Sequence, residues 1–257
     1  MPPVPPVARE LFELAVDLAT RGGDIALQHF ASAALHVETK ADGTPVTIAD
    51  REVERVLRAE IHTRFPGDAV LGEEDGADEG SSGRRWVIDP IDGTRAFMRG
   101  VPLFSTLLAL HDEHGPAIGV VRLPALATTV AAGRGLGCFR DGNPVRVSSH
   151  AALRGAYVTS SAFEHWPEPM LLAVKRAGCL LRTWGDGYGY YLVAIGAVDA
   201  MVDPEVSAWD MAPMPVLITE AGGRFSALDG SDRFDAGSGV ATNGRIHEAL
   251  LAALAAR

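Results

Sequence analysis

The sequence has few cysteines, few aromatic residues and no long apolar run. Its two cysteines, Cys138 and Cys179, form neither a disulfide framework nor a zinc-binding pattern, so we expect two reduced, buried thiols without a functional role. No apolar stretch approaches the roughly 20 residues of a membrane span. The proline-rich start, Met1 to Pro6, lacks the basic and apolar segments of a signal peptide. Together these absences predict a cytoplasmic protein that does not enter a membrane.

Basic residues are also in short supply. The chain has 23 Lys and Arg against 33 Asp and Glu, a net charge of -10, which disfavours nucleic acid as a partner. The same charge does not argue against a small phosphate ester held through metal ions. With 47% hydrophobic residues in 257, the chain can bury one large core or two intimately packed ones. We find no internal repeat and no linker that would separate independent domains.

Apolar spacing predicts helices in the first part of the chain. Residues 7–31 carry apolar side chains at helical intervals, interrupted at Gly22-Gly23, which indicates one or two helices. A further helix is expected over 49–64, ended by Pro66-Gly67, and 40–47 reads as a loop.

The remainder of the chain divides into two kinds of pattern. An antiparallel sheet is expected, with strands at 104–111, 117–123, 128–132 and 137–140 and a hairpin-like turn at 141–144. The second half alternates, which favours an α/β layer. Its strands are expected near 156–160, 180–183 and 200–202, and its helices near 168–177, 188–196 and 210–221.

The run from Trp86 to Thr94 (Trp-Val-Ile-Asp-Pro-Ile-Asp-Gly-Thr) is the most informative segment. Trp86 to Ile88 read as a buried strand, and Pro90 is expected to end it because proline cannot donate to a sheet ladder. Asp89 and Asp92 would then project from a tight turn at the carboxyl end of the strand.

Gly93 and Thr94 follow these carboxylates and are expected to begin a helix. The N–H groups at a helix start suit an anionic phosphate, which the two carboxylates alone would repel. Divalent cations between the two sets of charges would resolve that conflict.

Two further elements surround this run. Gly72-Glu73-Glu74 lies upstream, and Trp209-Asp210 lies downstream, before a helical run that ends at Gly222-Gly223. In this order the three elements resemble the inositol-monophosphatase-like family of magnesium-dependent, lithium-sensitive phosphatases. The resemblance covers roughly residues 10 to 250. A lone Asp-x-x-Asp would be weak evidence, whereas three ordered elements are strong evidence.

The resemblance implies an α/β (α+β) fold, an alternating αβαβα layered sandwich with two sheets. The chain would form a single phosphatase unit over residues 1–257. Its N-terminal α+β half, approximately 7–150, would carry most metal ligands. Its C-terminal α/β half, approximately 151–257, would carry the substrate pocket and Asp210. Homodimers are common in the family, although the sequence shows no identifiable interface.

By the same resemblance, the metal ligands are Glu73, Asp89, Asp92, Asp210 and the backbone carbonyl of Ile91. All are hard oxygen donors, which suits two or three Mg²⁺ ions, with Asp89 bridging two of them. A solvated turn or a helix cap is the alternative for each acid, and for Asp210 an N-cap role is the serious one.

The resemblance also assigns catalytic roles to Thr94, Asp50 and Glu73. Thr94 would contact the attacking water and Asp50 would polarise Thr94, so direct attack by water is expected. Gly93 and Thr94 would also bind the phosphate. Without the resemblance, Thr94 and Asp50 would be an ordinary helix start and a helix-terminal charge. Lys40 matches a lysine on a loop near the metals, with a surface lysine as the alternative.

The substrate is indicated by the second half. Where inositol monophosphatases carry a Gly-Ser segment, this chain has Gly185-Asp186, which looks like the histidinol-phosphate phosphatase branch of the family. A carboxylate can hold the ammonium and imidazole of histidinol phosphate, whereas inositol offers only neutral hydroxyls. Asp203 lies where the family places an acidic substrate contact, and Glu205 could join it. Turn or loop residues are the alternatives for all three acids.

The expectation is therefore a magnesium-dependent phosphomonoesterase that hydrolyses L-histidinol phosphate, as in histidine biosynthesis. Inositol 1-phosphate or a broad set of sugar and polyol phosphates are the alternatives within the same chemistry. A non-catalytic phosphate-ligand-binding regulator is the alternative from another class. The histidines, including His165, show no spacing typical of a metal site or base.

Overall fold

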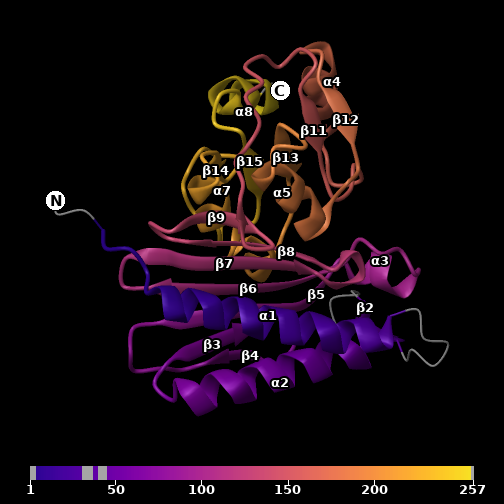
Figure 1. Ribbon diagram of the computed structural model, residues 1–257. Coiled ribbons are helices and arrows are strands. Elements are labelled where there is room, and N and C mark those ends of the chain that lie inside the picture. The colour runs from indigo at the N-terminus through magenta and orange to yellow at the C-terminus, as the bar shows by residue number, and fades with distance from the viewer. Residues whose placement is uncertain (1–3, 31–36, 40–44, 256–257) are drawn as a thin grey trace.

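Two sheets and three helical layers alternate through the molecule. The computed structural model describes residues 4–30, 37–39 and 45–255. Figure 1 shows α1 and α2 side by side on one face of the larger sheet, with the C-terminal half on its other face. The order helices, sheet, helices, sheet, helices confirms the predicted αβαβα sandwich.

The larger sheet comes from residues 69–144 and has the strand order β10-β9-β8-β7-β6-β5-β3-β4. All neighbours are antiparallel except β3 and β5, which are parallel. As a consequence, the chain that follows β3 and the chain that follows β5 leave the sheet at the same edge. The strands are β3 (Ala69–Gly72), β4 (Gly76–Asp78), β5 (Arg85–Asp92), β6 (Ser105–Asp112), β7 (Gly115–Leu123), β8 (Thr128–Gly133), β9 (Gly137–Arg140) and β10 (Asn143–Pro144).

The smaller sheet comes from residues 157–242 and has the order β12-β11-β13-β15-β14. It is mixed, with β12, β11 and β13 parallel and β15 antiparallel to both of its neighbours. Its strands are β11 (Tyr157–Thr159), β12 (Leu180–Arg182), β13 (Ala200–Asp203), β14 (Arg224–Ser226) and β15 (Gly239–Thr242). A separate antiparallel pair joins β1 (Val37–Thr39) and β2 (Pro45–Thr47).

Three large buried clusters and one small one fill the spaces between the layers. One lies between α1, α2 and the larger sheet, a second between the two sheets around α5 and α7, and a third beneath α4 and α8. The small cluster consists of Val87, Ala109 and Ala212. The helices are α1 (Arg9–His29), α2 (Ile48–Arg64), α3 (Thr94–Met98), α4 (Glu168–Arg176), α5 (Asp186–Ala194), α6 (Ala208–Met211), α7 (Met214–Glu220) and α8 (His247–Leu254), with a 3₁₀ turn at Pro124–Leu126.

The first helix is continuous through Gly22-Gly23. A Cβ at Gly22 would lie 3.0 Å from Leu57 of α2, and one at Gly23 would lie 2.6 Å from Arg122 of β7. These glycines therefore allow the helix to approach its neighbours closely, and of the one or two helices expected here the structure contains one.

Two predicted boundaries of secondary-structure elements near prolines are wrong. Strand β5 does not end at Pro90 but continues to Asp92, because the register with β6 shifts between Asp89 and Asp92 and the proline sits in that irregularity. Conversely, the single helix expected over 210–221 is two helices, α6 and α7. Pro213 and Pro215 have no N–H to donate, so the helical hydrogen bonds cannot continue through them.

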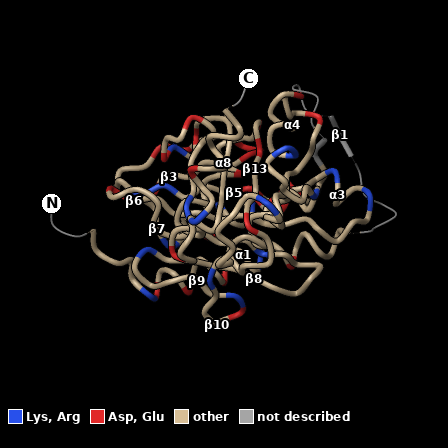
Figure 2. Tube along the Cα trace, turned by 90° about the horizontal axis from the view of Figure 1, so that it is seen from above, with Lys and Arg blue, Asp and Glu red and all other residues tan. Residues whose placement is uncertain are grey.

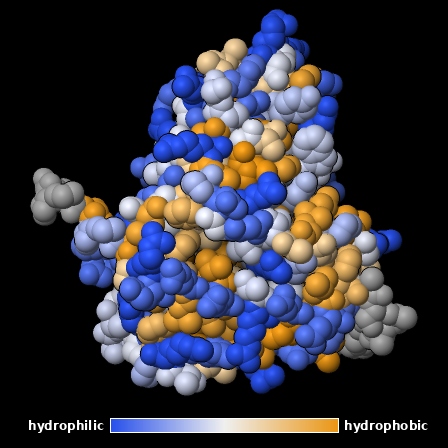
Figure 3. Space-filling view, in the orientation of Figure 1, coloured by the Kyte–Doolittle hydropathy of each residue, from blue (hydrophilic) through white to orange (hydrophobic). Residues whose placement is uncertain are grey.

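Figure 2 shows Lys and Arg distributed around the outline together with Asp and Glu. On the face drawn in Figure 3, hydrophobic residues are interspersed with hydrophilic ones over α1 and the strands beside it. Within the described ranges, every helix is too short or too polar to cross a bilayer.

Candidate active site

A cavity of about 480 Å³ lies where the two halves meet. It is lined by the end of β5, the start of α3, the first turn of α5, the end of β13 and helix α6. Most of the predicted site residues are among those that line it, namely Glu73, Asp89, Ile91, Asp92, Gly93, Thr94, Asp186, Asp203 and Asp210. Lys40 lies outside the described residues.

Three carboxylates converge in this cavity. One oxygen each from Asp89, Asp92 and Asp210 lie within 4.8 Å of one another. The bulge in β5 brings Asp89 and Asp92 together, and α6 contributes Asp210 from 118 residues further along the chain. Acidic residues that are distant in sequence but close in space are typical of a functional site.

Burial and mutual repulsion disfavour the charged forms of these groups. Burial, followed by the charges of Glu73, Asp92 and Asp210, raises the pKa of Asp89 well above its usual range. Burial, followed by Asp186 and Asp210, does the same to the pKa of Asp92. Burial raises the pKa of Asp210 to about 6, against the opposing hydrogen bond from Ser207. A cation between the carboxylates would remove this penalty.

Asp89 and Asp92 differ in what their oxygens contact. Asp92 Oδ2 accepts hydrogen bonds from the Ser105 hydroxyl and from the backbone N–H of Gly187 at 2.6 Å. Asp89 Oδ1 is buried and has no hydrogen-bond partner among the described residues. A buried carboxylate oxygen without a donor is costly unless something else binds it. The all-oxygen donor set and this orphaned atom therefore fit a hard divalent cation.

Asp210 is held by its own helix. It is the third residue of α6, and its Oδ2 accepts the backbone N–H of Ser207 at 2.9 Å in a capping box. Asp210 is thus not the N-cap, which was the alternative considered for it. The capping bond uses one oxygen and orients the carboxylate toward Asp89.

Glu73 enters the same cavity from the loop after β3. Its backbone N–H donates to the Ile88 carbonyl at 3.3 Å, which extends the parallel β3–β5 pairing by one residue. Its charge raises the pKa of Asp50, Asp89 and Asp210, so its carboxylate lies near all three.

Thr94 and Asp50 each have a local partner. The Thr94 hydroxyl donates to the Ile91 carbonyl at 3.0 Å, and Asp50 Oδ2 accepts the N–H and hydroxyl of Thr47 at 2.8 and 2.6 Å. No hydrogen bond joins Thr94 to Asp50 in the described part of the chain. Burial raises the pKa of Asp50 to about 6. The pairing of Thr94 with Asp50 therefore stays a prediction.

Asp186 adds a further carboxylate, beside the turn that contains Gly93. Helix α5 begins two residues earlier than expected, at Asp186 itself, whose φ of 53° is left-handed. A Cβ at Gly93 would lie 3.0 Å from Asp186 Oδ2, so this carboxylate packs against the Gly93 backbone. A non-glycine residue held at positive φ is strained, and such strain concentrates at functional positions. Burial raises the pKa of Asp186 to about 6.

Both carboxylate oxygens of Asp203 already accept hydrogen bonds from other residues. Its oxygens accept hydrogen bonds from the Ser161 N–H and hydroxyl, the Ser160 hydroxyl and the Tyr190 hydroxyl. Ser161 in turn accepts the N–H of Asp186 at 2.8 Å. Asp203 therefore supports the turn that presents Asp186, and a direct substrate contact by Asp203 stays a prediction.

The mouth of the cavity contains Glu205 and three residues for which no sequence motif predicts a role, namely Arg95, Glu164 and His165. Arg95 contacts Glu164 at 2.8 Å, and His165 lies 3.4 Å from Glu164 and 3.1 Å from Glu205. Arg95 is in α3, Glu164 and His165 are neighbours in one loop, and Glu205 is in another, so only their shared cavity brings them together. The sequence suggests a role for Glu205 but none for His165.

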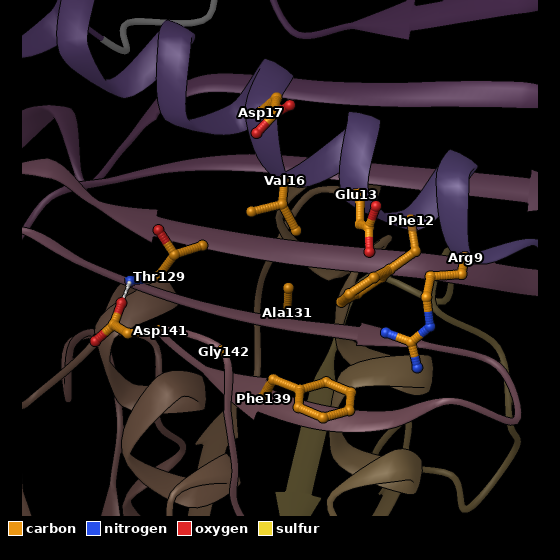
Figure 4. A pocket seen from close by; sticks show the side chains of 10 residues that line it. All are labelled: Arg9, Phe12, Glu13, Val16, Asp17, Thr129, Ala131, Phe139, Asp141 and Gly142. Atoms are coloured by element: carbon orange, nitrogen blue, oxygen red, sulfur yellow. Dashed lines mark hydrogen bonds between the residues drawn. The ribbon is translucent and has the colours of Figure 1, made fainter.

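A second hollow lies far from these residues, between α1 and strands β8 and β9 (Figure 4). It measures about 280 Å³, and its floor is formed by Phe12, Val16, Ala131 and Phe139. Figure 4 shows the carboxylates of Glu13, Asp17 and Asp141 spread along the rim without converging. This groove lacks the concentration of polar groups that the first cavity has.

Known proteins share both the sequence and the fold. The model of the inositol monophosphatase family matches residues 8–257. A histidinol-phosphatase of Mycobacterium tuberculosis is 42% identical over 94% of this chain and 96% of its own length. An inositol-1-monophosphatase of Mesorhizobium japonicum is 33% identical over 95% of this chain and 96% of its own.

Among solved structures, an inositol monophosphatase of Thermotoga maritima superimposes with a TM-score of 0.86. It is 29% identical and covers 95% of this chain and 96% of its own. The match extends over both sheets and all layers, because almost the whole of each chain is included. Together with the convergent carboxylates, these similarities show that the chain belongs to the inositol monophosphatase family.

Proposed function

We propose that this protein is a Mg²⁺-dependent phosphomonoesterase that hydrolyses L-histidinol phosphate to L-histidinol and phosphate in the cytoplasm. The observation that carries the phosphatase activity is the convergence of Asp89, Asp92 and Asp210, with the Asp89 Oδ1 atom lacking a partner. The substrate is supported by similarity to histidinol-phosphatases at 42% and 38% identity over at least nine-tenths of the chain.

The proposed activity assigns a separate role to each group of site residues. Glu73, Asp89, Asp92, Asp210 and the Ile91 carbonyl would hold two or three Mg²⁺ ions at the end of β5. Bound Mg²⁺ supplies a water of lowered pKa and stabilises negative charge on the phosphate and the leaving oxygen. Gly93 and Thr94, at the start of α3, would orient the phosphate. The Thr94 hydroxyl would orient the attacking water, and Asp50 would accept its proton through Thr94.

The other end of the substrate would lie against acidic side chains. L-Histidinol carries an ammonium group and an imidazole, and both can donate to carboxylates. Asp186 lies beside the phosphate-facing Gly93 backbone, and Glu205 lies at the mouth of the same cavity. A neutral polyol can donate hydroxyl hydrogen bonds to these carboxylates but lacks the charge attraction that an ammonium group adds. This difference in charge favours histidinol phosphate over inositol 1-phosphate.

The experiment is phosphate release from L-histidinol phosphate and from inositol 1-phosphate, each with Mg²⁺ and with a chelator. We expect Mg²⁺-dependent release with a large preference for histidinol phosphate. A preference for inositol 1-phosphate, or equal turnover of several polyol phosphates, would keep the chemistry and overturn the substrate. Tight Mg²⁺-dependent binding without turnover of any ester would favour a regulator instead. Light scattering of the same sample tests whether this chain forms a homodimer, as the family resemblance suggests.

A further inference from the structure

A fully buried carboxylate lies next to the metal-facing loop without entering the cavity. Glu54 is on α2, one helical turn after Asp50, and its side chain has no exposed surface. Its Oε2 accepts the backbone N–H of Glu74 at 2.8 Å, and its Oε1 accepts that of Asp75 at 3.0 Å. Glu54 therefore fixes the two backbone amides that directly follow Glu73.

Arg58 completes this arrangement one turn further along α2. Its Nε donates to Glu54 Oε1 at 2.9 Å, which neutralises the buried charge. The same guanidinium donates to the Gly76 carbonyl and, at 2.7 Å, to Asp78 Oδ2. Glu54 and Arg58 thus connect α2, the helix that also carries Asp50, to the β3–β4 turn and to strand β4.

Gly72 shows how closely the carboxylate approaches the loop. A Cβ at position 72 would lie 2.0 Å from Glu54 Oε1 and 2.3 Å from its carboxyl carbon. Only glycine leaves room for the Glu54 side chain at this point. The first residue of the Gly-Glu-Glu element therefore allows Glu54 of α2 to reach the loop that follows β3. Gly72 has no positive φ to explain its presence.

Stability alone is a weak reason for such a pair. A buried ion pair roughly breaks even against apolar side chains of similar volume, because both charges must be removed from water. The Glu54–Arg58 pair instead fixes a backbone position, and groups that orient a metal ligand commonly change metal affinity by about 10- to 100-fold.

We propose that Glu54, buttressed by Arg58, is a positioning residue that holds Glu73 in the geometry required for divalent-cation binding. The inference rests on the proposed function, since it takes Glu73 as a metal ligand. Glu54 itself touches neither the metal nor the substrate. It acts through the Glu74 and Asp75 amides, and so links a metal ligand rigidly to the helix of Asp50.

The test is a double-mutant cycle on Mg²⁺ affinity, measured by titration calorimetry on the full chain. Glu54→Gln replaces one accepting oxygen by an NH₂ group that cannot accept an amide N–H. We expect it to weaken Mg²⁺ binding about tenfold, with a smaller change in kcat at saturating Mg²⁺. Glu52→Gln, on the exposed face of the same helix, is the matched control and should leave the affinity unchanged.

The second arm repeats Glu54→Gln in a Glu73→Gln background. If Glu54 acts through Glu73, then Glu54→Gln weakens Mg²⁺ affinity by less than a further twofold when Glu73 is already Gln. Equal losses in both backgrounds, or unchanged affinity in folded Glu54→Gln, would overturn the inference. Full Mg²⁺ affinity in Glu73→Gln alone would instead overturn the ligand role of Glu73 in the proposed function.

If Glu54→Gln does not fold, as judged by circular dichroism, Arg58→Lys provides the alternative. Lysine keeps the charge near Glu54 but cannot reach Gly76 and Asp78 with the same planar fork. We expect about a threefold weaker Mg²⁺ affinity with an unchanged fold, and an unchanged affinity would contradict the inference.

Discussion

The two hollows of this molecule differ in how their carboxylates are arranged and buried. In the cavity at the end of β5, carboxylates from both halves converge on one point, are buried, and have raised pKa values. In the groove between α1 and β8, only the three acids Glu13, Asp17 and Asp141 line the hollow, and they lie apart from one another beside an apolar floor. The comparison teaches that acids which converge and are buried distinguish the candidate site from an ordinary surface groove.

The sharpest way to break this comparison is to remove one acid from each hollow. Asp89→Asn keeps the shape of the side chain and removes the charge at the centre of the cluster. We expect kcat/KM to fall about a thousandfold, equivalent to ~4 kcal/mol of transition-state stabilisation. Asp17→Asn in the groove should leave kcat/KM within twofold. Phosphate release measures both, and a modest loss in Asp89→Asn would place the chemistry elsewhere.

The raised pKa values give a dependence of stability on pH and Mg²⁺. A folded pKa of about 6 for Asp50, Asp186 and Asp210, above the usual 3.8, means that the folded state holds protons longer. Without Mg²⁺ these groups favour the fold below pH 4, and their contribution is lost as the pH rises through 6. Each such shift corresponds to about 3 kcal/mol.

Mg²⁺ should therefore stabilise the protein more at pH 7.5 than at pH 5. Urea unfolding with and without Mg²⁺ at both values measures this difference. Burial lowers the pKa of His247 to about 4, so this residue weakens the fold as the pH falls below 6.5. Its effect is equal with and without Mg²⁺ and cancels in the difference. An equal Mg²⁺ increment at both pH values would contradict the proposed role of Asp210, with Asp89 and Asp92, as ligands.

The groove should contribute stability and not activity. Phe139 contacts Phe12, with ring centroids 6.1 Å apart, and packs against the first buried cluster. Because Phe139 is partly exposed, we expect Phe139→Ala to lower the free energy of unfolding by about 2 kcal/mol, with kcat/KM within twofold of the unchanged protein. Urea unfolding and phosphate release give the two numbers. A specific loss of activity with intact stability would make the groove a functional site.

The smallest effect is expected within the cavity, at its substrate end. Asp186→Asn removes the charge while keeping a side chain that tolerates left-handed φ. We expect KM for histidinol phosphate to rise about tenfold, a difference of roughly 1.4 kcal/mol, and KM for inositol 1-phosphate to stay within twofold. Steady-state kinetics on both esters separate the cases. Equal losses on the two substrates would assign Asp186 to phosphate or metal binding instead of selectivity.

The local parts of the site could be predicted from the sequence. Asp89, Asp92, Gly93 and Thr94 lie within six consecutive positions, so a strand, a turn and a helix start determine their neighbourhood. Apolar periodicity likewise identified α1, α2 and most strands of the larger sheet, because those signals depend on nearest neighbours along the chain.

The elements after Ala221 were missed for a related reason. Strand β14 has only three residues, β15 is buried on both sides, and α8 is mostly alanine and leucine, so none presents a clear alternation. The place of β14 and β15 is decided by the strands with which they pair. Likewise Pro90 could be read as a strand end because the bulge that accommodates it depends on β6.

By itself, then, the sequence determined the donor chemistry: hard oxygen ligands at the end of a buried strand, in the order of one phosphatase family. Only the tertiary structure decided which groups support them. The Gly187 N–H on Asp92, Ser161 between Asp203 and Asp186, and Glu54 beneath the Glu73 loop are contacts between residues 20 to 95 positions apart. Such contacts leave no local pattern, because hydrogen bonds require only closeness in space, which the packing of two sheets supplies.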